Sequence, residues 1–303
     1  MKASAHEPAV DIDETLLRNW PLPMPPTDGD KEQKGRILLV GGSPEMPGAI
    51  MLVATAALRA GAGKLTVATA SSVAPLVAAQ IPEAKVIALA EDPSGALAPG
   101  ALQAGLEKIA DRFDAVVIGP GFESSPCLLD DILALLPKFT EAKVVLDACA
   151  MDVVSLPEWK QCERSMPPML LTPHAGEMAH LTGWPKSAVK EQPEEILQRT
   201  TIDWQAVVAL KGASTLIASP AGTRWRYQGG NSGLGVSGSG DTLAGVIGGL
   251  AARGASLEQA CVWGVALHAR AGTALAEKYG PVGYLAREIS GEIPRLMHAL
   301  SPA

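Results

Sequence analysis

The sequence predicts an α/β protein in which helices cover both faces of a mostly parallel sheet. Short apolar runs recur along the chain without the alternation of polar and apolar residues that marks a half-exposed strand. Helix-like segments rich in Ala, Leu and Val separate these runs, which is typical of parallel sheets. Aromatic residues make up only 4% of the chain, so aliphatic side chains must build the core. A three-layer helix–sheet–helix architecture is expected.

The first 35 residues differ from the rest. Residues 13–18 predict a short helix, and the segment 20–26 contains four prolines. Proline fixes φ and lacks a backbone donor, so an extended course should follow the helix. We interpret residues 1–35 as an N-terminal arm laid on a single domain that spans residues 36–303.

Within that domain each apolar run ends at a turn residue. The run 36–40 ends at Gly41, the run 114–118 at Gly119 and the run 143–146 at Asp147. Strands are expected at residues 36–40, 65–68, 85–89, 114–118, 143–146, 169–171, 206–210, 215–218 and 224–227. Helices are expected at residues 48–60, 73–80, 102–110, 128–135, 176–181, 194–200, 241–252 and 257–278.

Composition excludes several classes of protein. The formal net charge is −7 and no basic cluster stands out, so no nucleic-acid partner is expected. The N-terminus has no apolar leader and no run reaches about 18 apolar residues, so a cytoplasmic location without a membrane span is predicted. The spacing of the cysteines favours reduced thiols over a disulfide framework or a zinc site; they are Cys127, Cys149, Cys162 and Cys261.

Ligands of parallel sheets bind at the carboxyl ends of the strands. The strongest motif there runs from Gly233 to Thr242 and leads into an Ala/Leu/Gly-rich helix. Glycines let the backbone approach an anion, and the free N–H groups of the helix attract it. Asp241 then stands where it can exchange a proton beside a phosphate held by residues 237–240. The alternative is that Asp241 is an ordinary residue of the first helical turn.

Two other nucleotide motifs are not supported. Gly233, Gly235 and Gly238 have the spacing of a dinucleotide fingerprint, but no βαβ start or later acidic residue accompanies them. The segment 61–65 lacks the spacing and the hydroxyl residue of a phosphate-binding P-loop.

Six segments of the chain together form a pattern. They are Gly41-Gly42-Ser43 with Pro47-Gly48-Ala49, Ile118-Gly119-Pro120-Gly121, Leu146-Asp147-Ala148, Leu171-Thr172-Pro173-His174-Ala175-Gly176-Glu177, Leu210-Lys211-Gly212-Ala213-Ser214-Thr215 and Gly238-Ser239-Gly240-Asp241. In these segments and in their order, the chain resembles the ADP/ATP-dependent NAD(P)H-hydrate dehydratases of the ribokinase-like superfamily over about residues 34–290.

The resemblance implies an enzyme that repairs hydrated NADH and NADPH: a nucleotide phosphorylates the hydrate, and elimination of phosphate restores the nicotinamide ring. With ADP as donor, AMP and phosphate are released. It implies Asp241 as the catalytic residue, and Mg²⁺, held in part by Glu177, at the phosphates. The implied hydrate-binding residues are Ala49, Gly121, His174 and Asp241. The implied nucleotide-binding residues are Lys211, Gly212, Ala213, Ser214, Thr215 and Gly240.

Elementary chemistry agrees with two of these roles. Lys211 ends a strand and offers a cation to phosphate oxygens; the alternative is a solvated surface lysine. His174 lies on a turn into a helix, where it could also act as a cap. His174 and His180 lack the i, i+4 spacing of a helical metal pair.

The chain departs from the family pattern at two places. Cys149 stands where the family usually has a second acidic residue, and Phe122-Glu123 follows the Gly-Pro-Gly turn where Leu-Gly is common. The separate epimerase domain often fused to such enzymes has no counterpart in residues 1–35, so only the dehydration step is expected.

Two other functions remain open from sequence. One is an ATP-dependent kinase of the same superfamily that acts on a vitamin precursor or a sugar; the other is a nucleotide-binding protein without catalysis. The sequence does not separate ADP from ATP as donor, nor NADH hydrate from NADPH hydrate; the resemblance to bacterial-type single-domain forms of the family implies ADP. Apolar helix surfaces favour a homo-oligomer, such as a tetramer.

Overall fold

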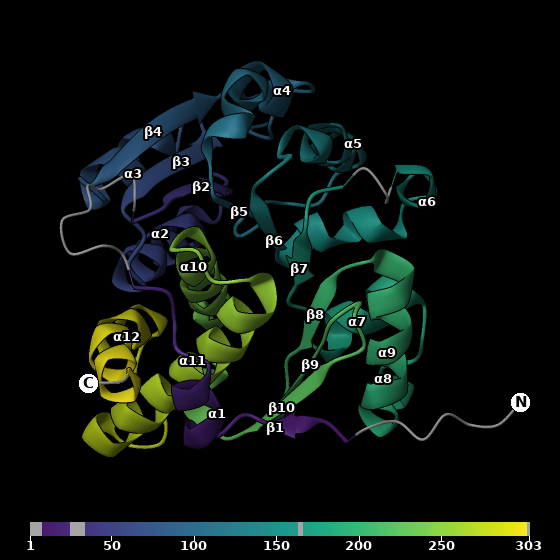
Figure 1. Cartoon of the computed structure of the whole chain (residues 1–303). Coiled ribbons are helices and arrows are strands. Elements are labelled where there is room, and N and C mark those ends of the chain that lie inside the picture. The colour runs from purple at the N-terminus through teal and green to yellow at the C-terminus, as the bar shows by residue number, and fades with distance from the viewer. Residues whose placement is uncertain (1–7, 25–33, 163–165, 302–303) are drawn as a thin grey trace, which may run out of the picture.

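The computed structural model describes residues 8–24, 34–162 and 166–301. In this part of the chain ten strands form one sheet, in the order β1-β10-β9-β8-β7-β6-β5-β2-β3-β4 (Figure 1). From β8 to β4 every neighbouring pair is parallel, whereas β9 is antiparallel to β8 and to β10. The strands are β1 (Val10–Asp11), β2 (Arg36–Val40), β3 (Lys64–Ala70), β4 (Ala84–Leu89), β5 (Ala115–Ile118), β6 (Lys143–Leu146), β7 (Met169–Leu171), β8 (Val207–Leu210), β9 (Ser214–Ala218) and β10 (Arg224–Gln228).

Helices cover both faces of the sheet, as predicted. The helices of the described residues are α1 (Glu14–Asn19), α2 (Pro47–Arg59), α3 (Ala74–Gln80), α4 (Ala101–Leu106), α5 (Pro126–Leu135), α6 (Trp159–Cys162), α7 (Ala175–Thr182), α8 (Lys186–Glu191), α9 (Pro193–Trp204), α10 (Ser239–Ala252), α11 (Leu257–Tyr279) and α12 (Ala286–Leu300). Figure 1 shows α2, α10, α11 and α12 on one side, and α4, α5, α7 and α9 on the other.

Strand β2 illustrates why these runs lack alternation. Ile37 and Leu39 belong to the hydrophobic core beneath α2 and α10, whereas Leu38 and Val40 belong to the core beneath α4 and α5. All four side chains have no exposed surface. Successive strand residues point to opposite faces, so a strand covered on both faces must be apolar throughout.

Helices α2 and α10 pack backbone to backbone. A Cβ atom built on Gly245 would lie 2.4 Å from the carbonyl oxygen of Val53, and one built on Gly249 would lie 2.5 Å from that of Ala57. From the first contact to the second, the chain advances by four residues on α10 and by four residues on α2. The two helices therefore run parallel and in register. Both helices also begin six residues before the first contact, at Pro47 and Ser239. Their amino ends therefore lie level with one another.

The described part of the N-terminal segment, residues 8–24, contacts the domain. Strand β1 pairs with β10 at the edge of the sheet. The ring of Trp20 stacks on Trp225 at 6.0 Å between centroids. Its carbonyl oxygen accepts hydrogen bonds from Trp263 Nε1 and Gln259 Nε2. The division into an arm and a domain stays a prediction, and part of the expected extended course, residues 25–33, lies outside the described residues.

Several elements were not predicted individually. They are β1, α6, α8, α12 and 3-10 helices at Leu136–Lys138, Ala148–Ser155 and Ser232–Leu234. The expected helix 102–110 is also wrong in its second half, because α4 ends at Leu106 and continues as a 3-10 helix over Glu107–Arg112. Pro294 lies inside α12, and proline disfavours a helix in a sequence-based reading although packing tolerates it here.

No helix in the described residues is long and apolar enough to span a membrane. Cys127, Cys149 and Cys261 have free thiols, as the predicted reduced state requires. The side chain of Cys162 lies outside the described residues.

Candidate active site

A cavity of about 730 Å³ opens at the carboxyl edge of the sheet. It lies between the turn after β8, the segment after β10, and the amino end of α10. Its lining comprises His174, Lys211, Gly212, Ala213, Thr215, Tyr227, Gly229, Gly230, Asn231, Ser232, Leu234, Gly235, Val236, Ser239, Gly240, Leu243, Val265, His268 and Ala269. Most of this lining is backbone, glycine and apolar side chain, and Lys211 is its one permanent cation among the described residues. Such a surface suits a ligand with an apolar body and an anionic end.

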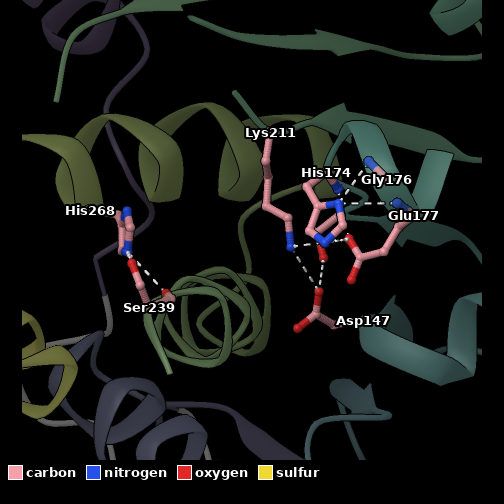
Figure 2. A network of polar contacts seen from close by, with 8 residues as sticks. Asp147, His174, Gly176, Glu177, Lys211, Ser239 and His268 are labelled. Atoms are coloured by element: carbon pink, nitrogen blue, oxygen red, sulfur yellow. Dashed lines mark hydrogen bonds and ion pairs between the residues drawn. The ribbon is translucent and has the colours of Figure 1, made fainter. Parts of the chain in front are cut away.

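Lys211 is held by carboxylates from two neighbouring strand ends. Its Nζ lies 3.3 Å from Asp147 Oδ1 and 3.9 Å from Glu177 Oε2 (Figure 2). Asp147 is only 3% exposed and accepts a second hydrogen bond, of 2.5 Å, from the hydroxyl of Thr172. The backbone N–H of Lys211 donates to Pro173 O, which joins the β7 and β8 turns. The ammonium is thereby aimed at the cavity before any ligand arrives.

Charges in this group alter one another's protonation. Burial disfavours the charged ammonium of Lys211, but Asp147, Glu177 and Asp241 raise its pKa above the ordinary value. Lys211 is therefore a cation throughout the physiological pH range. Burial and the Asp147 carboxylate raise the pKa of Asp241 to about 6, against the opposing effect of Lys211. A carboxyl with that pKa can both accept and return a proton near neutral pH.

His174 caps α7. Its Nδ1 accepts hydrogen bonds from the backbone N–H groups of Gly176 and Glu177, at 2.9 and 3.0 Å. Glu177 Oε2 in return accepts from the N–H of His174 at 2.7 Å, which completes a capping box. The capping alternative raised from the sequence is thus confirmed. These bonds fix the ring through Nδ1, and its edge lines the cavity.

The first glycine loop and the Gly-Pro-Gly turn form one surface. Gly42 N donates to Pro120 O at 2.9 Å. A Cβ built on Gly121, whose φ is +76°, would lie 2.9 Å from the Cβ of Ala49 and 2.8 Å from Met46 O. A side chain at this position would both strain the backbone and separate the loops. Ala49 and Gly121 are therefore neighbours, as a shared binding surface requires.

A second cavity, of about 380 Å³, lies beside these loops. Gly42, Ser43 and Phe122 line it, together with Ser94 and Leu97 from the segment after β4. It adjoins the surface formed by Ala49 and Gly121.

The amino end of α10 lies close both to Lys211 and to α2. Gly238, with a φ of +87°, is the N-cap residue that precedes the helix. A Cβ built on Gly240 would lie 3.6 Å from Lys211 Nζ, so the helix start and the lysine face the same space. A Cβ built on Gly238 would lie 2.4 Å from Leu52 on α2 and 3.9 Å from Asp241 Oδ2. The Asp241 carboxyl thus lies on the side of α10 that faces α2.

The structure brings most of the predicted site residues together. Lys211, Gly212, Ala213, Thr215 and Gly240 line the larger cavity, as a nucleotide pocket would require. Ser214 does not; it is exposed, and its hydroxyl donates to the carbonyl oxygen of Tyr227 at 3.2 Å. Ser214 begins β9 and its hydroxyl binds the neighbouring strand, so it stands outside the lining of this cavity.

Two residues of the site were not assigned a role from the sequence. Asp147 was noted as the residue that ends a strand and as part of a family segment, but it was given no role, although a carboxylate at one strand end can pair with a lysine at another. His268 lies within a long apolar helix, where it reads as a core residue. Both become informative only when the fold places them beside Lys211 and Ser239 (Figure 2).

The donors near the cavity fit a magnesium ion. Carboxylate oxygens are the ligands that Mg²⁺ prefers, and it is commonly held by one or two carboxylates plus phosphate oxygens. Glu177 and Asp147 are such groups beside Lys211. In the described residues no three His, Cys, Asp or Glu side chains gather as a metal site, so the remaining ligands would have to come from a nucleotide and water.

Cys149 connects two parts of the site. Its thiol donates to Phe122 O at 3.5 Å, which ties the 3-10 helix after β6 to the Gly-Pro-Gly turn. Burial and the nearby Asp152 carboxylate raise the pKa of this thiol to about 12. The residue is therefore neutral where an acidic side chain would be charged.

The comparisons with known proteins identify the family. The model of the NAD(P)H-hydrate dehydratase family matches residues 37–295. The ADP-dependent (S)-NAD(P)H-hydrate dehydratase of Xanthomonas campestris is 46% identical over 94% of both chains. The corresponding protein of Bacillus subtilis is 31% identical over 91% of this chain and 93% of its own. A bifunctional NAD(P)H-hydrate repair enzyme of Moorella thermoacetica is 38% identical, but the chain spans only 52% of its length.

Solved structures give the same result. The ADP/ATP-dependent NAD(P)H-hydrate dehydratase of Bacillus subtilis, co-crystallised with ATP and Mg²⁺, superimposes with a TM-score of 0.82 at 30% identity, covering 96% of this chain and 99% of the other. A ribokinase-like superfamily protein of Enterococcus faecalis gives a TM-score of 0.81 at 25% identity over 99% of both chains. The chain therefore has a ribokinase-like fold and belongs to the NAD(P)H-hydrate dehydratase family.

Proposed function

We propose that this protein dehydrates hydrated NADH and NADPH at the expense of an adenine nucleotide, preferably ADP. The observation that carries the proposal is the meeting, at one sheet edge, of a buried cation, an aspartate of raised pKa, and a helix start that carries no side chain at Gly240. These groups hold a phosphate and take a proton beside it. The names of the related enzymes supply the acceptor.

The nucleotide would occupy the 730 Å³ cavity. Its base and ribose fit the apolar wall that includes Leu234, Leu243 and Val265. Its phosphates would reach Lys211 and the free N–H groups at the start of α10, where the helix dipole favours an anion. Mg²⁺ would neutralise further phosphate charge, with Glu177 or Asp147 as protein ligand.

The hydrate would approach from the side of α2. Ala49 and Gly121 offer a flat surface without projecting side chains, and the ring edge of His174 offers a polar group. Asp241 faces this side. It would accept the proton of the hydrate's hydroxyl while that oxygen attacks the terminal phosphorus of the nucleotide.

The sequence of bonds is balanced. The P–O bond to AMP breaks as the bond from the hydrate's oxygen to phosphorus forms, when ADP is the donor. The C–O bond of the phosphorylated hydrate then breaks and phosphate leaves with the electron pair. Loss of a proton from the neighbouring ring carbon restores the double bond of the reduced nicotinamide. The net products are NADH or NADPH, AMP and phosphate.

We also propose a cytoplasmic location and a homo-oligomeric state for this protein. Exposed apolar side chains such as Leu76, Ile202 and Val282 support self-association. The preferred donor, ADP or ATP, is decided by the same assay that tests the activity.

The test is to follow the near-ultraviolet absorbance of reduced nicotinamide in purified protein with NADH hydrate, Mg²⁺ and either ADP or ATP. Growth of that absorbance only with nucleotide, with AMP formed from ADP, is the expected result. Tight nucleotide binding without growth for either hydrate would refute the proposal and point to a kinase for another small alcohol. The same assay with NADPH hydrate compares the two substrates, and a reaction without nucleotide is the control.

A further inference from the structure

Helix α11 carries a buried histidine that the proposed chemistry does not use. His268 is 8% exposed and lines the nucleotide-sized cavity. Its Nε2 lies 3.1 Å from the hydroxyl oxygen of Ser239 and 3.0 Å from the carbonyl oxygen of the same residue. Figure 2 shows this pair at the start of α10, apart from the Lys211 group.

The chemistry of the two contacts decides where the proton lies. A carbonyl oxygen can only accept, so Nε2 must carry the hydrogen. Burial lowers the pKa of His268 to about 4, so the ring is neutral and has only this one proton. The histidine therefore donates from Nε2, and the Ser239 hydroxyl faces a donor.

The Ser239 hydroxyl must then direct its own hydrogen elsewhere. An oxygen that faces an N–H accepts from it and cannot donate to it. Ser239 is the first residue of α10, lines the cavity, and stands next to Gly240. Its hydrogen can then point into the cavity, whose lining includes both Ser239 and Lys211.

We propose that His268 is a positioning residue for nucleotide binding: by donating from Nε2 to Ser239, it orients the Ser239 hydroxyl as a donor to a nucleotide phosphate and anchors the first turn of α10. The proposal rests on the proposed function in that it assumes a nucleotide in this cavity. The role differs from that of Lys211, because it supplies a directed hydrogen bond instead of a charge. It also differs from catalysis, because His268 contacts Ser239 and not the phosphate.

Three single variants, the Ser239→Ala/His268→Leu double variant and a control test it by calorimetric titration with ADP alone, so that no dehydratase activity is needed. Ser239→Ala removes the hydroxyl, and His268→Leu removes the donor. His268→Gln keeps an N–H donor near the position of Nε2. Cys261→Ala is the control, because Cys261 is also buried on α11, seven residues earlier, and does not line the cavity.

The expected result is that Ser239→Ala and His268→Leu each weaken ADP binding by about tenfold or more, as for one hydrogen bond to a charged group. The double variant should bind no more weakly than the worse single variant, because both changes remove one interaction. His268→Gln should restore the affinity to within about threefold. Cys261→Ala should lower the melting temperature and leave ADP affinity unchanged.

Wild-type affinity in Ser239→Ala would overturn the proposal, and so would additive losses in the double variant. The proposal also fails if His268→Leu binds ADP as well as Cys261→Ala does. If His268→Leu does not fold, Ser239→Ala and His268→Gln still decide the matter. Impaired ADP binding in these variants, combined with no dehydration by the wild-type protein, would refute the proposed function and leave this inference standing.

Discussion

Ala49 and Asp241 stand at equivalent positions on two parallel helices. Each lies four residues before the point where Gly245 on α10 touches the backbone of Val53 on α2. The distance between the two candidate site residues is therefore determined largely by the backbone contacts at Gly245 and Gly249. Such close packing of two helix backbones keeps the site residues within the narrow range of positions that catalysis demands.

The first prediction concerns that contact. Gly245→Ala should lower the free energy of unfolding by about 1–3 kcal/mol, because its Cβ would meet the Val53 carbonyl and the helices must separate. The shift should also reduce turnover by moving Asp241. Gly291→Ala is the matched control, since Gly291 lies in α12 with no atom within 4 Å of the new Cβ; it should stabilise by about 0.5–1 kcal/mol. Chemical denaturation measures both, and equal effects would contradict the packing argument.

The second prediction concerns the proton acceptor. Asp241→Asn should bind ADP with an affinity close to that of the wild-type protein but lose about 10²–10⁴-fold in kcat, because the helix start remains and the general base does not. Titration calorimetry and the absorbance assay give the two numbers. A parallel loss of affinity and turnover would mean that Asp241 acts on the nucleotide and not on the acceptor.

The third prediction follows from the raised pKa of Asp241. Its folded-state pKa of about 6 exceeds the ordinary value of 3.8, so the folded protein holds the proton more tightly than the unfolded chain. Proton binding at Asp241 therefore stabilises the folded state. This contribution to the free energy of unfolding is complete below the ordinary pKa of 3.8 and is lost as pH rises through about 6. Asp241→Asn should therefore raise the melting temperature at pH 8 and change it little at pH 3.5. The wild-type kcat should fall as pH drops below about 6. If Asp241→Asn raised the melting temperature at pH 3.5 and not at pH 8, the pKa of Asp241 would not be raised in the folded protein.

The fourth prediction separates the two roles of Lys211. Lys211→Met leaves the buried Asp147 carboxylate without its cation, which should cost about 3–5 kcal/mol of stability and weaken ADP binding. Adding Asp147→Asn should restore much of the stability but not the ADP affinity. Lys138→Met is the control, because its ion pair with Glu107 is exposed to solvent and removing it should change stability little. Recovery of ADP affinity in the double variant would show that Lys211 only stabilises the fold.

The layered fold could be predicted because each layer has a local signature. Strand β2 is apolar on both faces, and α10 begins with a glycine turn and is otherwise small and apolar. Helix α12 was not given its own range, since its internal proline obscures the helical pattern and its core contacts are long-range. The two-residue β1 forms only because β10 is already in place, which no local signal can reveal.

The site could be predicted from the sequence as a set of strand-end turns, but not as a network. Sequence order indicates that Lys211 and Asp147 both end strands, and only the strand order makes β6, β7 and β8 neighbours. The pairing of His268 with Ser239 joins two helices across 29 residues of chain. The exposed position of Ser214 depends on the register of β9 against β10, which a one-residue slip would reverse.

The pairing of β1 with β10 has a practical consequence for handling the protein. Strand β10 ends the antiparallel side of the sheet, and Val10 and Asp11 cover its open backbone groups. An uncovered edge strand is a template for pairing with another molecule. A preparation trimmed at the start of the chain, through residue 12, would expose Trp225 and Arg226 in this way, and solubility would suffer before the catalytic machinery did.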